Sequence, residues 1–458
     1  MSREIILKLG VAPIKRGVGF TSAADCLIFK NNTYEALKNI DKNVEIVNID
    51  GVVPDGIVTG PEQVPAVADY LKSQKVDALF LLHTDFASEE AVAKLGKEMG
   101  LPVLVWGPRD DGPDENGVRI RDTQCGILAS SKVLSRFGVK FTYIVNCHPT
   151  DETFINGVND FCRTAAVLKA FKKMRILKIL DRPNAFFSVM CNEDELLSKF
   201  GIEVSPMSAG QLFSGVNKLK ENGSPELEAQ ILSMKERIDT SALGDEKLRT
   251  LAAMILVVKK EMDNGGFAGA SIECWTSMGQ LFGVMPCQLI GELTALGYPI
   301  ACEGDINGAI SSVMLHAADY NRSSSFFADL TIRHPSNDNA ELLWHCGPFP
   351  RALMGDTPNP SIASGGQGQW GLKQGDLTII RFDVLDGEYS MFLGEGKAVD
   401  GPKSTGTYVW LEVDDWAKWE RKIVEGPYIH HVPGMYGKYA GVLKEACKYI
   451  DGLTADPV

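Results

Sequence analysis

Three carboxylates in the second half of the chain lie in apolar surroundings that favour a chemical role. Glu303 and Asp305, in ACEGDINGA, follow a short apolar strand and precede a predicted helix, and α/β sheets place ligand-binding residues at such strand ends. Asp329, in FFADL, lies inside a predicted apolar strand, where a carboxylate is costly to bury unless it is paired, hydrogen-bonded or metal-bound. Asp329 is therefore either a metal ligand or the partner of a buried salt bridge to Arg322 or Arg333.

The chain has 7 histidines, and their scarcity makes their sequence contexts informative. His345 ends a strand-like run in LLWHCGP, and His430 and His431 lie in GPYIHHVPG between a turn and an apolar stretch. A single histidine in such a context is more often a packed residue than a metal ligand. Two carboxylates with one or two histidines form an oxygen and nitrogen ligand set suited to Mn²⁺, Fe²⁺, Co²⁺ or Mg²⁺. The residues therefore predict a metal-assisted enzyme that acts on a small polar substrate.

Motifs and charge exclude several classes of protein. The chain has no P-loop and no GxSxG, and GVAPIKRGVG does not fit the glycine pattern of dinucleotide-binding folds. The formal net charge of −13 disfavours nucleic-acid binding. No apolar run approaches the roughly 18 residues of a membrane helix, and the start, MSREIILKLG, shows no secretory signal. The 10 cysteines are scattered without a CxxC and are expected to be free and reduced, which predicts a cytoplasmic protein.

The elements that must position these residues follow an α/β pattern in the first third of the chain. Short, nearly continuous apolar runs predict strands buried on both faces of a parallel sheet, at 4–11, 44–49, 78–83, 103–107 and 143–146. Amphipathic segments alternate with these strands, at 61–74, 87–99 and 123–137, and a longer one covers 151–172. This alternation predicts a doubly wound α/β domain over residues 1–172.

The α/β pattern restarts after residue 172 and then gives way to β structure. Strands are predicted at 175–180, 202–207, 269–275, 299–304 and 326–333, with two helical stretches over 208–263 and a helix with one buried face at 307–319. These elements predict a second α/β domain over residues 173–338. Residues 339–458 are rich in turn residues and strand-like runs, which predict a β-rich, barrel-like C-terminal domain with a final helix at 437–450.

Several runs together resemble the L-fucose isomerase-like family, a distant relative of the L-arabinose isomerases. They are PIACEGDINGAISSVMLH, FFADL, SIECWTS, WHCGP, GPYIHHV and, in the N-terminal half, GPRDDGP followed by RDTQCGI. The order of the motifs is preserved along the whole chain. The Glu-Gly-Asp at 303–305 is similar to the family's Glu-x-Asp strand end, FADL to its Phe-Ala-Asp, and HHV to its C-terminal metal-binding histidine segment.

The resemblance implies an aldose–ketose isomerase that uses a divalent metal, most often Mn²⁺, with Co²⁺ or Mg²⁺ as alternatives. It implies two α/β domains and a barrel-like C-terminal domain in a homo-oligomer, expected to be a trimer or hexamer, with the active site near a subunit interface. Glu303 and Asp329 would be both metal ligands and acid–base groups, and His431, rather than His430, would be the third ligand. A cis-enediol would lie between aldose and ketose.

Further residues are predicted to contact the substrate: His345, Trp275, Glu273, Arg109 and His430. The expected substrate is a free sugar of the L-fucose, D-arabinose, L-arabinose or D-galactose type. Substitutions of Asp305 and Glu273 are expected to have milder effects, through orientation or substrate choice. Two alternatives stay open, a metal-dependent lyase acting on a sugar acid and a non-catalytic sugar-binding protein.

Overall fold

The computed structural model describes residues 3–18 and 21–458, so residues 1, 2, 19 and 20 of the predicted first domain lie outside the described part. The chain forms two compact units, the N-terminal unit of residues 5–169 and the second unit of Arg3, Glu4 and residues 170–458. The domain boundary expected at residue 172 stays a prediction. The further division at 338 stays a prediction, since the rest of the chain groups as one unit.

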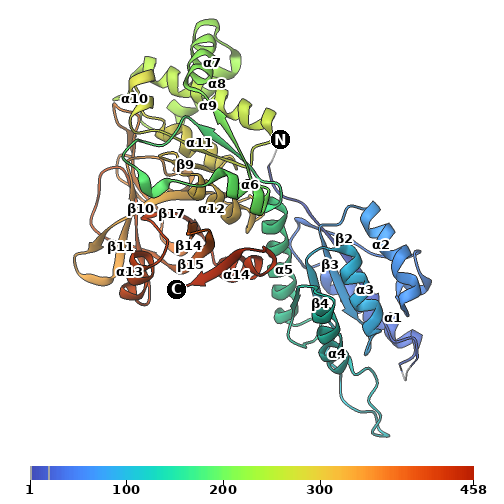
Figure 1. Cartoon of the computed structure of the whole chain (residues 1–458). Helices are drawn as coiled ribbons and strands as arrows, with labels where there is room; N and C mark the ends of the chain where they lie inside the picture. Colours follow the sequence, from blue (N-terminus) through green and yellow to red (C-terminus); the bar gives the residue numbers. More distant parts are fainter. Residues whose placement is uncertain (1–2, 19–20) are drawn as a thin grey trace. The chain divides into compact units, whose positions relative to one another are not determined.

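The N-terminal unit is built on a parallel five-stranded sheet in the order β2-β1-β3-β4-β5 (Figure 1). Its strands are β1 (Leu7–Ile14), β2 (Val44–Val47), β3 (Ala78–His83), β4 (Val103–Trp106) and β5 (Phe141–Tyr143). Its helices are α1 (Ala23–Leu37), α2 (Val64–Ser73), α3 (Glu89–Met99), α4 (Thr123–Arg136) and α5 (Glu152–Phe171). The order runs out to β2 and back past β1, which is the doubly wound topology expected from the sequence.

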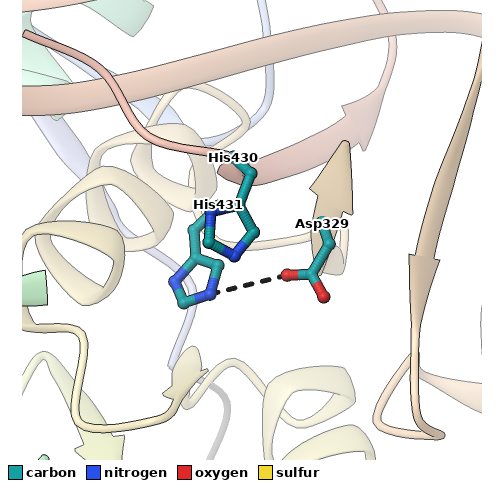
Figure 2. A group of neighbouring side chains, drawn as sticks. All are labelled: Asp329, His430 and His431. Carbon is teal, nitrogen blue, oxygen red and sulfur yellow. Dashed lines mark ion pairs between the residues drawn. The ribbon is translucent and has the colours of Figure 1, made fainter. Parts of the chain in front are cut away.

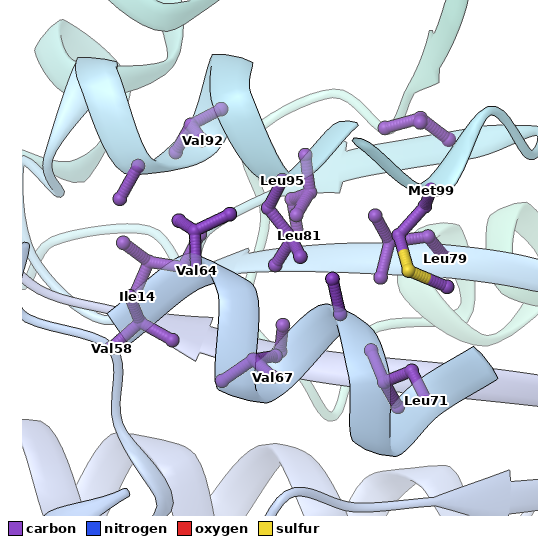
Figure 3. Close-up of a cluster of buried hydrophobic side chains, with 14 of the residues drawn as sticks. Ile14, Val58, Val64, Val67, Leu71, Leu79, Leu81, Val92, Leu95 and Met99 are labelled. Carbon is purple, nitrogen blue, oxygen red and sulfur yellow. The ribbon is translucent and has the colours of Figure 1, made fainter. Parts of the chain in front are cut away.

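The core of the N-terminal unit shows why these segments form a layered structure. Every residue of β3 is buried, and Leu79 and Leu81 pack with Val67 and Leu71 of α2 and Leu95 of α3 (Figure 3). The near-continuous apolar run of β3 is what a strand covered by helices on both faces requires.

The second unit begins with a parallel four-stranded sheet in the order β7-β6-β8-β9. Its strands are β6 (Arg175–Ile179), β7 (Glu203–Met207), β8 (Gly269–Ile272) and β9 (Ile300–Cys302). Its helices are α6 (Glu193–Phe200), α7 (Ala209–Asn222), α8 (Pro225–Arg237), α9 (Asp245–Gly265), α10 (Ser277–Phe282), α11 (Cys287–Ala295) and α12 (Ile306–Ala317). Residues 208–263 form three helices instead of the expected two, because Gly223 and Ser224 end α7 and cap α8.

A nine-stranded sheet makes up the rest of the second unit. Its strands are β10 (Ser325–His334), β11 (Asn337–His345), β12 (Ser361–Ile362), β13 (Gly368–Gly371), β14 (Gly375–Leu385), β15 (Glu388–Val399), β16 (Thr407–Glu412), β17 (His431–Tyr436) and β18 (Leu453–Pro457). Antiparallel pairs join β16, β11, β10, β17, β14 and β15 in turn, and β15 pairs again with β16, which closes the sheet into a barrel. Two helices accompany it, α13 (Trp416–Glu425) and α14 (Ala440–Tyr449).

The fold class expected from the sequence is thus confirmed, with one strand placed differently. Strand β10 was expected in the second α/β sheet, but it pairs with β11 and β17 inside the barrel. Its apolar residues Phe326 and Ala328 pack in the barrel core with Leu343, Ile379 and Phe392. A strand that is apolar on one face suits a parallel α/β sheet as well as an antiparallel barrel. The sequence of β10 therefore did not decide which of the two sheets it joins.

Helix α12 connects the two sheets of the second unit. All of its residues are buried, because it packs against β8 and β9 on one side and β14 and β17 on another. The sequence predicted only one buried face. The close approach on the other side is possible because α12 carries small residues there, Gly308, Ala309, Ser311 and Ser312. The Ser311 and Ser312 hydroxyls donate to the Asn307 and Gly308 carbonyls at 2.7 and 2.9 Å, so they are satisfied within the helix.

None of the helices in the described part of the chain is both long and apolar enough to cross a membrane.

Candidate active site

The site begins at the turn between β9 and α12. Glu303 and Gly304 both have left-handed backbone conformations, with φ of 63° and 73°. A side chain at Gly304 would place its Cβ 2.8 Å from the Arg182 Cα, so only glycine fits there. Asp305 then caps α12 by accepting a 2.8 Å hydrogen bond from the Gly308 N–H. This strained turn aims the Glu303 and Asp305 side chains toward the barrel.

Two neighbouring barrel strands supply the facing groups. Asp329 on β10 is directly opposite His431 on β17 in the antiparallel ladder. The His431 Nε2 lies 3.5 Å from the Asp329 Oδ1 and 3.1 Å from the Glu303 Oε2 (Figure 2 draws the histidine and Asp329). Residues 303, 329 and 431, far apart in the sequence, therefore meet around one imidazole nitrogen.

The other side of the His431 ring is held by Asp305. The His431 Nδ1 lies 3.0 Å from the Asp305 Oδ2, so the Nδ1–H donates to this carboxylate and Nε2 is directed at Glu303 and Asp329. Burial lowers the pKa of His431, but the hydrogen bonds with Asp305 and Glu303 outweigh it and raise the pKa to about 9. With carboxylates on both sides, the imidazole requires a proton or another cation on Nε2 at neutral pH.

Asp305 is itself part of a buried ion network. Arg381 on β14 contacts both oxygens of Asp305 and donates from Nε to Asp383 at 2.8 Å, and the side chains of Asp305 and Arg381 are 0% and 1% exposed. Burial raises the pKa of Asp305, but the Arg381 charge and His431 hold this pKa well below its usual range. Asp305 is therefore a fixed anion that orients His431.

This burial changes the effect expected of an Asp305→Asn substitution. The sequence suggested a mild loss, but the neutral amide would leave the Arg381 charge in the core with one carboxylate partner fewer. We expect the variant to lose about 3–5 kcal/mol of unfolding free energy, measured by denaturant titration. An Asp376→Asn variant, which loses an exposed ion pair with Lys438, is the matched control and should lose about 1 kcal/mol or less. Equal losses in both variants would contradict this account of the network.

His345 approaches the same site from the end of β11. Its Nδ1 accepts a 2.9 Å hydrogen bond from the Cys346 N–H, so the proton of the neutral ring lies on Nε2. Burial lowers its pKa, but the Asp329 charge and Cys346 raise the pKa to about 10. The charged ring carries a proton on both nitrogens, so it also donates from Nε2 but no longer accepts from the Cys346 N–H. In both states His345 offers an N–H donor from Nε2, which suits contact with a substrate oxygen better than metal ligation.

The donor set fits a divalent cation. The Asp329 Oδ1 and the His345 Nε2 are buried and have no hydrogen-bond partner among the described residues, a costly arrangement unless a ligand satisfies them. Ligand atoms of Asp329, His430 and His431 all lie within 4.8 Å of one another. Carboxylate oxygens with one imidazole suit Mn²⁺, Co²⁺ or Mg²⁺ better than Zn²⁺.

The two adjacent histidines differ in their surroundings. His431 is fully buried and held at Nδ1, whereas His430 is exposed and packs edge-on against the His431 ring, with centroids 4.4 Å apart. Partial desolvation of its ring and the charge of the neighbouring His431 lower the pKa of His430. His431 therefore has the fixed orientation expected of a ligand, whereas His430 belongs to the same group of potential ligands, so the choice between them stays a prediction.

Two protein-family models match the chain. The N-terminal domain of fucose/sulfoquinovose isomerases matches residues 10–172, and the C-terminal domain of L-fucose isomerase matches residues 364–453. This chain belongs to the L-fucose isomerase-like family. As a member of that family it is a sugar isomerase, so the sequence-based family assignment is confirmed.

Curated relatives carry a more specific name. A protein of Priestia megaterium named sulfoquinovose isomerase is 26% identical over 375 residues, which cover 79% of this chain and 81% of the relative. One of Alkalicoccus urumqiensis with the same name is 24% identical over 357 residues, 76% of this chain and 78% of the relative. A solute-binding protein of Actinobacillus succinogenes with bound D-allose shows only a slight structural likeness, with 13% identity, a TM-score of 0.17 and coverage of 68% of this chain and 92% of that one.

Glu273 and Trp275, two predicted substrate contacts, follow β8 at the carboxyl edge of the four-stranded sheet. Glu303 follows β9 at the same edge. Trp275 is 60% exposed there, and its ring packs on Phe186 with centroids 5.2 Å apart, which makes an aromatic wall at the sheet edge. Glu273 is buried, and its carboxylate accepts from the Thr276 N–H, the Thr276 hydroxyl and the Ser277 N–H at 2.8–3.0 Å. Its oxygens therefore hold the start of α10, and its contact with substrate stays a prediction.

Arg109 lies in the N-terminal unit, just after β4. It is exposed, and the nearby Asp110 and Asp111 pair with the buried Arg121 rather than with Arg109. The two acidic residues beside Arg109 in the sequence therefore form ion pairs with Arg121. A role of Arg109 in substrate binding stays a prediction.

Two functional groups were missed in the sequence. Arg381 lies in TIIRFDV, and a charged pair inside such an apolar strand was a usable signal for a buried ion network. Arg182 follows β6 and lies against the Glu303–Gly304 turn, but nothing in its local sequence marked it. Its position there depends on the pairing of β6 with β8, which no local sequence pattern predicts.

Proposed function

We propose that the chain is a divalent-metal-dependent aldose–ketose isomerase that acts on a free sugar through a cis-enediol. The proposal depends chiefly on one observation, the meeting of the Glu303 and Asp329 carboxylates at the oriented Nε2 of His431, with the buried Asp329 Oδ1 left without a hydrogen-bond partner among the described residues. These three residues would hold the ion, most suitably Mn²⁺. When bound, the ion supplies Lewis acidity that stabilises negative charge on the sugar oxygens.

The residues themselves provide the proton chemistry. Isomerisation removes the C2 proton, returns a proton to C1 and moves one between O2 and O1. Burial raises the pKa of Glu303, but its hydrogen bond with His431 and the His345 charge lower the pKa overall, so this carboxylate is ionised and able to accept a proton at neutral pH. Asp329 is the second carboxylate within reach, and the His345 Nε2–H donates to a sugar oxygen as negative charge develops there.

An anionic sugar is favoured among the substrates. Four curated relatives are named sulfoquinovose isomerase, after a sugar that carries a sulfonate. Arg182 lies beside the Glu303–Gly304 turn, donates from Nη1 only to the Pro183 and Asn184 carbonyls at 3.2 Å, and forms no ion pair with any described residue. Such an uncompensated guanidinium suits a sulfonate. L-Fucose, D-arabinose, L-arabinose and D-galactose are the neutral candidates.

The proposed function is tested by incubating purified protein and Mn²⁺ with sulfoquinovose and the four neutral sugars. Ketose formation is followed by NMR in D₂O. A cis-enediol exchanges its proton with solvent, so deuterium should enter C1 of the ketose. Ketose without deuterium would contradict the proton-transfer route, and cleaved or dehydrated products from a sugar acid would favour the lyase alternative.

Arg182 gives a prediction about substrate choice. Replacing Arg182 with glutamine removes one charge-assisted contact, so the KM for sulfoquinovose should rise about 10- to 100-fold. The KM for any neutral sugar that is turned over should stay unchanged. Arg249→Gln, which removes a distant surface partner of Glu228, is the matched control. An equal rise for charged and neutral sugars would show that Arg182 only maintains the turn.

We also propose that the protein is a cytoplasmic homo-oligomer, as the family resemblance implies, with a trimer or hexamer as the expected state.

A further inference from the structure

Two thiols lie next to the candidate site without a role in the proposed isomerisation. Cys287 is the first residue of α11 and Cys346 directly follows β11, and their sulfurs are 3.6 Å apart although 59 residues separate them in the sequence. Both belong to the second unit. All 10 cysteines of the chain are free in this structure, and most of them are buried.

The distance between the two sulfurs is close to that of a disulfide. An S–S bond is about 2.05 Å long, so the sulfurs must approach by about 1.5 Å from their separation of 3.6 Å. Cys346 directly follows β11, and its sulfur contacts only the Cys287 sulfur and the His345 Nδ1 among the interactions found in the described residues. Neither cysteine belongs to the group of potential metal ligands formed by Asp329, His430 and His431.

The two thiols differ in their access to solvent. Cys287 is 1% exposed, whereas Cys346 is partly exposed. The hydrogen bond with the Cys287 thiol is the main cause that lowers the pKa of Cys346, which favours the nucleophilic thiolate at the accessible residue. An oxidant would therefore meet Cys346 first, with Cys287 placed behind it to react next.

We propose that Cys346 and Cys287 form a reversible modification site that hydroperoxides oxidise to a disulfide. The Cys346 thiolate attacks the peroxide, the O–O bond breaks, and Cys346 becomes a sulfenic acid as the peroxide leaves as water or an alcohol. The Cys287 sulfur then attacks the Cys346 sulfur, the S–O bond breaks and water leaves. Two thiols lose two electrons and two protons in total, and the peroxide is reduced by the same two electrons.

The disulfide would act on the site through His345. The Cys346 sulfur lies 3.3 Å from the His345 Nδ1, on the side of the ring opposite the Nε2 that faces the site. Formation of the S–S bond pulls this sulfur toward α11 and removes its contact with the imidazole. The effect on turnover rests on the proposed isomerase function, whereas formation of the disulfide does not.

The test uses full-length protein treated with hydrogen peroxide, blocked with iodoacetamide and mapped by mass spectrometry without reduction. We expect a peptide linked through Cys287 and Cys346, a fall in turnover of about 10- to 100-fold, and recovery of both on adding dithiothreitol. The Cys287→Ser variant should keep near-normal turnover when reduced and should form no linked peptide. A Cys125→Ser variant, which removes an exposed cysteine of the other unit, should behave like the unmodified chain.

If the peroxide-treated protein without substitutions gave no linked peptide, the proposal would be overturned, whatever its turnover. A linked peptide with undiminished turnover would overturn the action through His345. Because the mass measurement needs no substrate, a failure of the isomerase proposal would not be mistaken for a failure of the disulfide.

Discussion

Replacing Glu303 with glutamine should lower turnover by about 10²–10⁴-fold, the usual loss when an acid–base group is removed, and by more if metal is also lost. Asp329→Asn should have a similar effect. In both variants kcat should fall far more than KM rises, because the lost interactions act on the reacting atoms. Steady-state kinetics with Mn²⁺ in excess, together with the bound metal content, measures both consequences.

The location of Glu303 makes this substitution informative. Its carboxylate contacts only the site, at 3.1 Å from the His431 Nε2, while the neighbouring Asp305 holds the surrounding structure. The variant should therefore keep its melting temperature within a few degrees. The matched control is Glu292→Gln. This variant alters a part-buried glutamate of α11 that pairs with Arg237 of α8, and it should keep its turnover. Near-normal turnover of Glu303→Gln with metal bound would refute the proposed isomerase site.

The Asp329→Asn substitution also tests whether Asp329 is a metal ligand or a structural ion-pair partner. The sequence left open a buried salt bridge with Arg322 or Arg333, but Arg322 pairs with Asp319 at 2.8 Å and Arg333 lies near Glu420 at 3.9 Å. The structure therefore gives Asp329 no arginine partner among the described residues. If Asp329→Asn lowered only the melting temperature, with metal content and turnover unchanged, the carboxylate would be structural after all.

Removal of divalent metal should abolish turnover, and Mn²⁺, Co²⁺ or Mg²⁺ should restore it. Dialysis against EDTA followed by activity measurements with each ion tests this expectation. A chain that keeps full activity after complete removal of metal, verified by elemental analysis, would refute the metal-dependent mechanism. Recovery with Zn²⁺ alone would contradict the ligand argument, since two carboxylates and one imidazole favour the harder ions.

The affinity for Mn²⁺ should also depend on pH in a defined direction. In the metal-free protein the His431 pKa is raised from 6.5 to about 9, so the ring is protonated at neutral pH and a metal must displace that proton. Affinity should therefore rise about tenfold per pH unit between pH 7 and 8 and level off above the raised pKa. Isothermal titration calorimetry at several pH values measures this slope, and a flat profile would contradict the protonated state of His431.

The raised pKa of His431 also predicts how the folding stability of the metal-free protein changes with pH. A histidine whose pKa is raised on folding contributes stability below its unfolded value of 6.5, and this contribution is lost as pH rises toward about 9. The metal-free chain should therefore become less stable across this range. With Mn²⁺ bound the same imidazole needs no proton, so the loss should be smaller.

The sequence by itself determined the fold class and indicated most of the candidate site residues. Continuous apolar runs such as 78–83 predicted strands buried on both faces, and β3 is buried throughout. Glu303, Asp329 and His431 stood out because a charged or titratable group in apolar surroundings is costly without a partner, and this cost depends on local sequence alone. The family motifs located the same three residues.

Only the tertiary structure decided how these residues work together. Asp305 and Arg381 are 76 residues apart, and their ion pair exists because α12 packs against β14. The orientation of His431 follows from that pair, and so does its difference from the adjacent His430. Likewise, β10 joined the barrel because pairing with β17 buries its apolar face and sets Asp329 opposite His431. Such contacts depend on which surfaces meet in space, and no local pattern of residues encodes that choice.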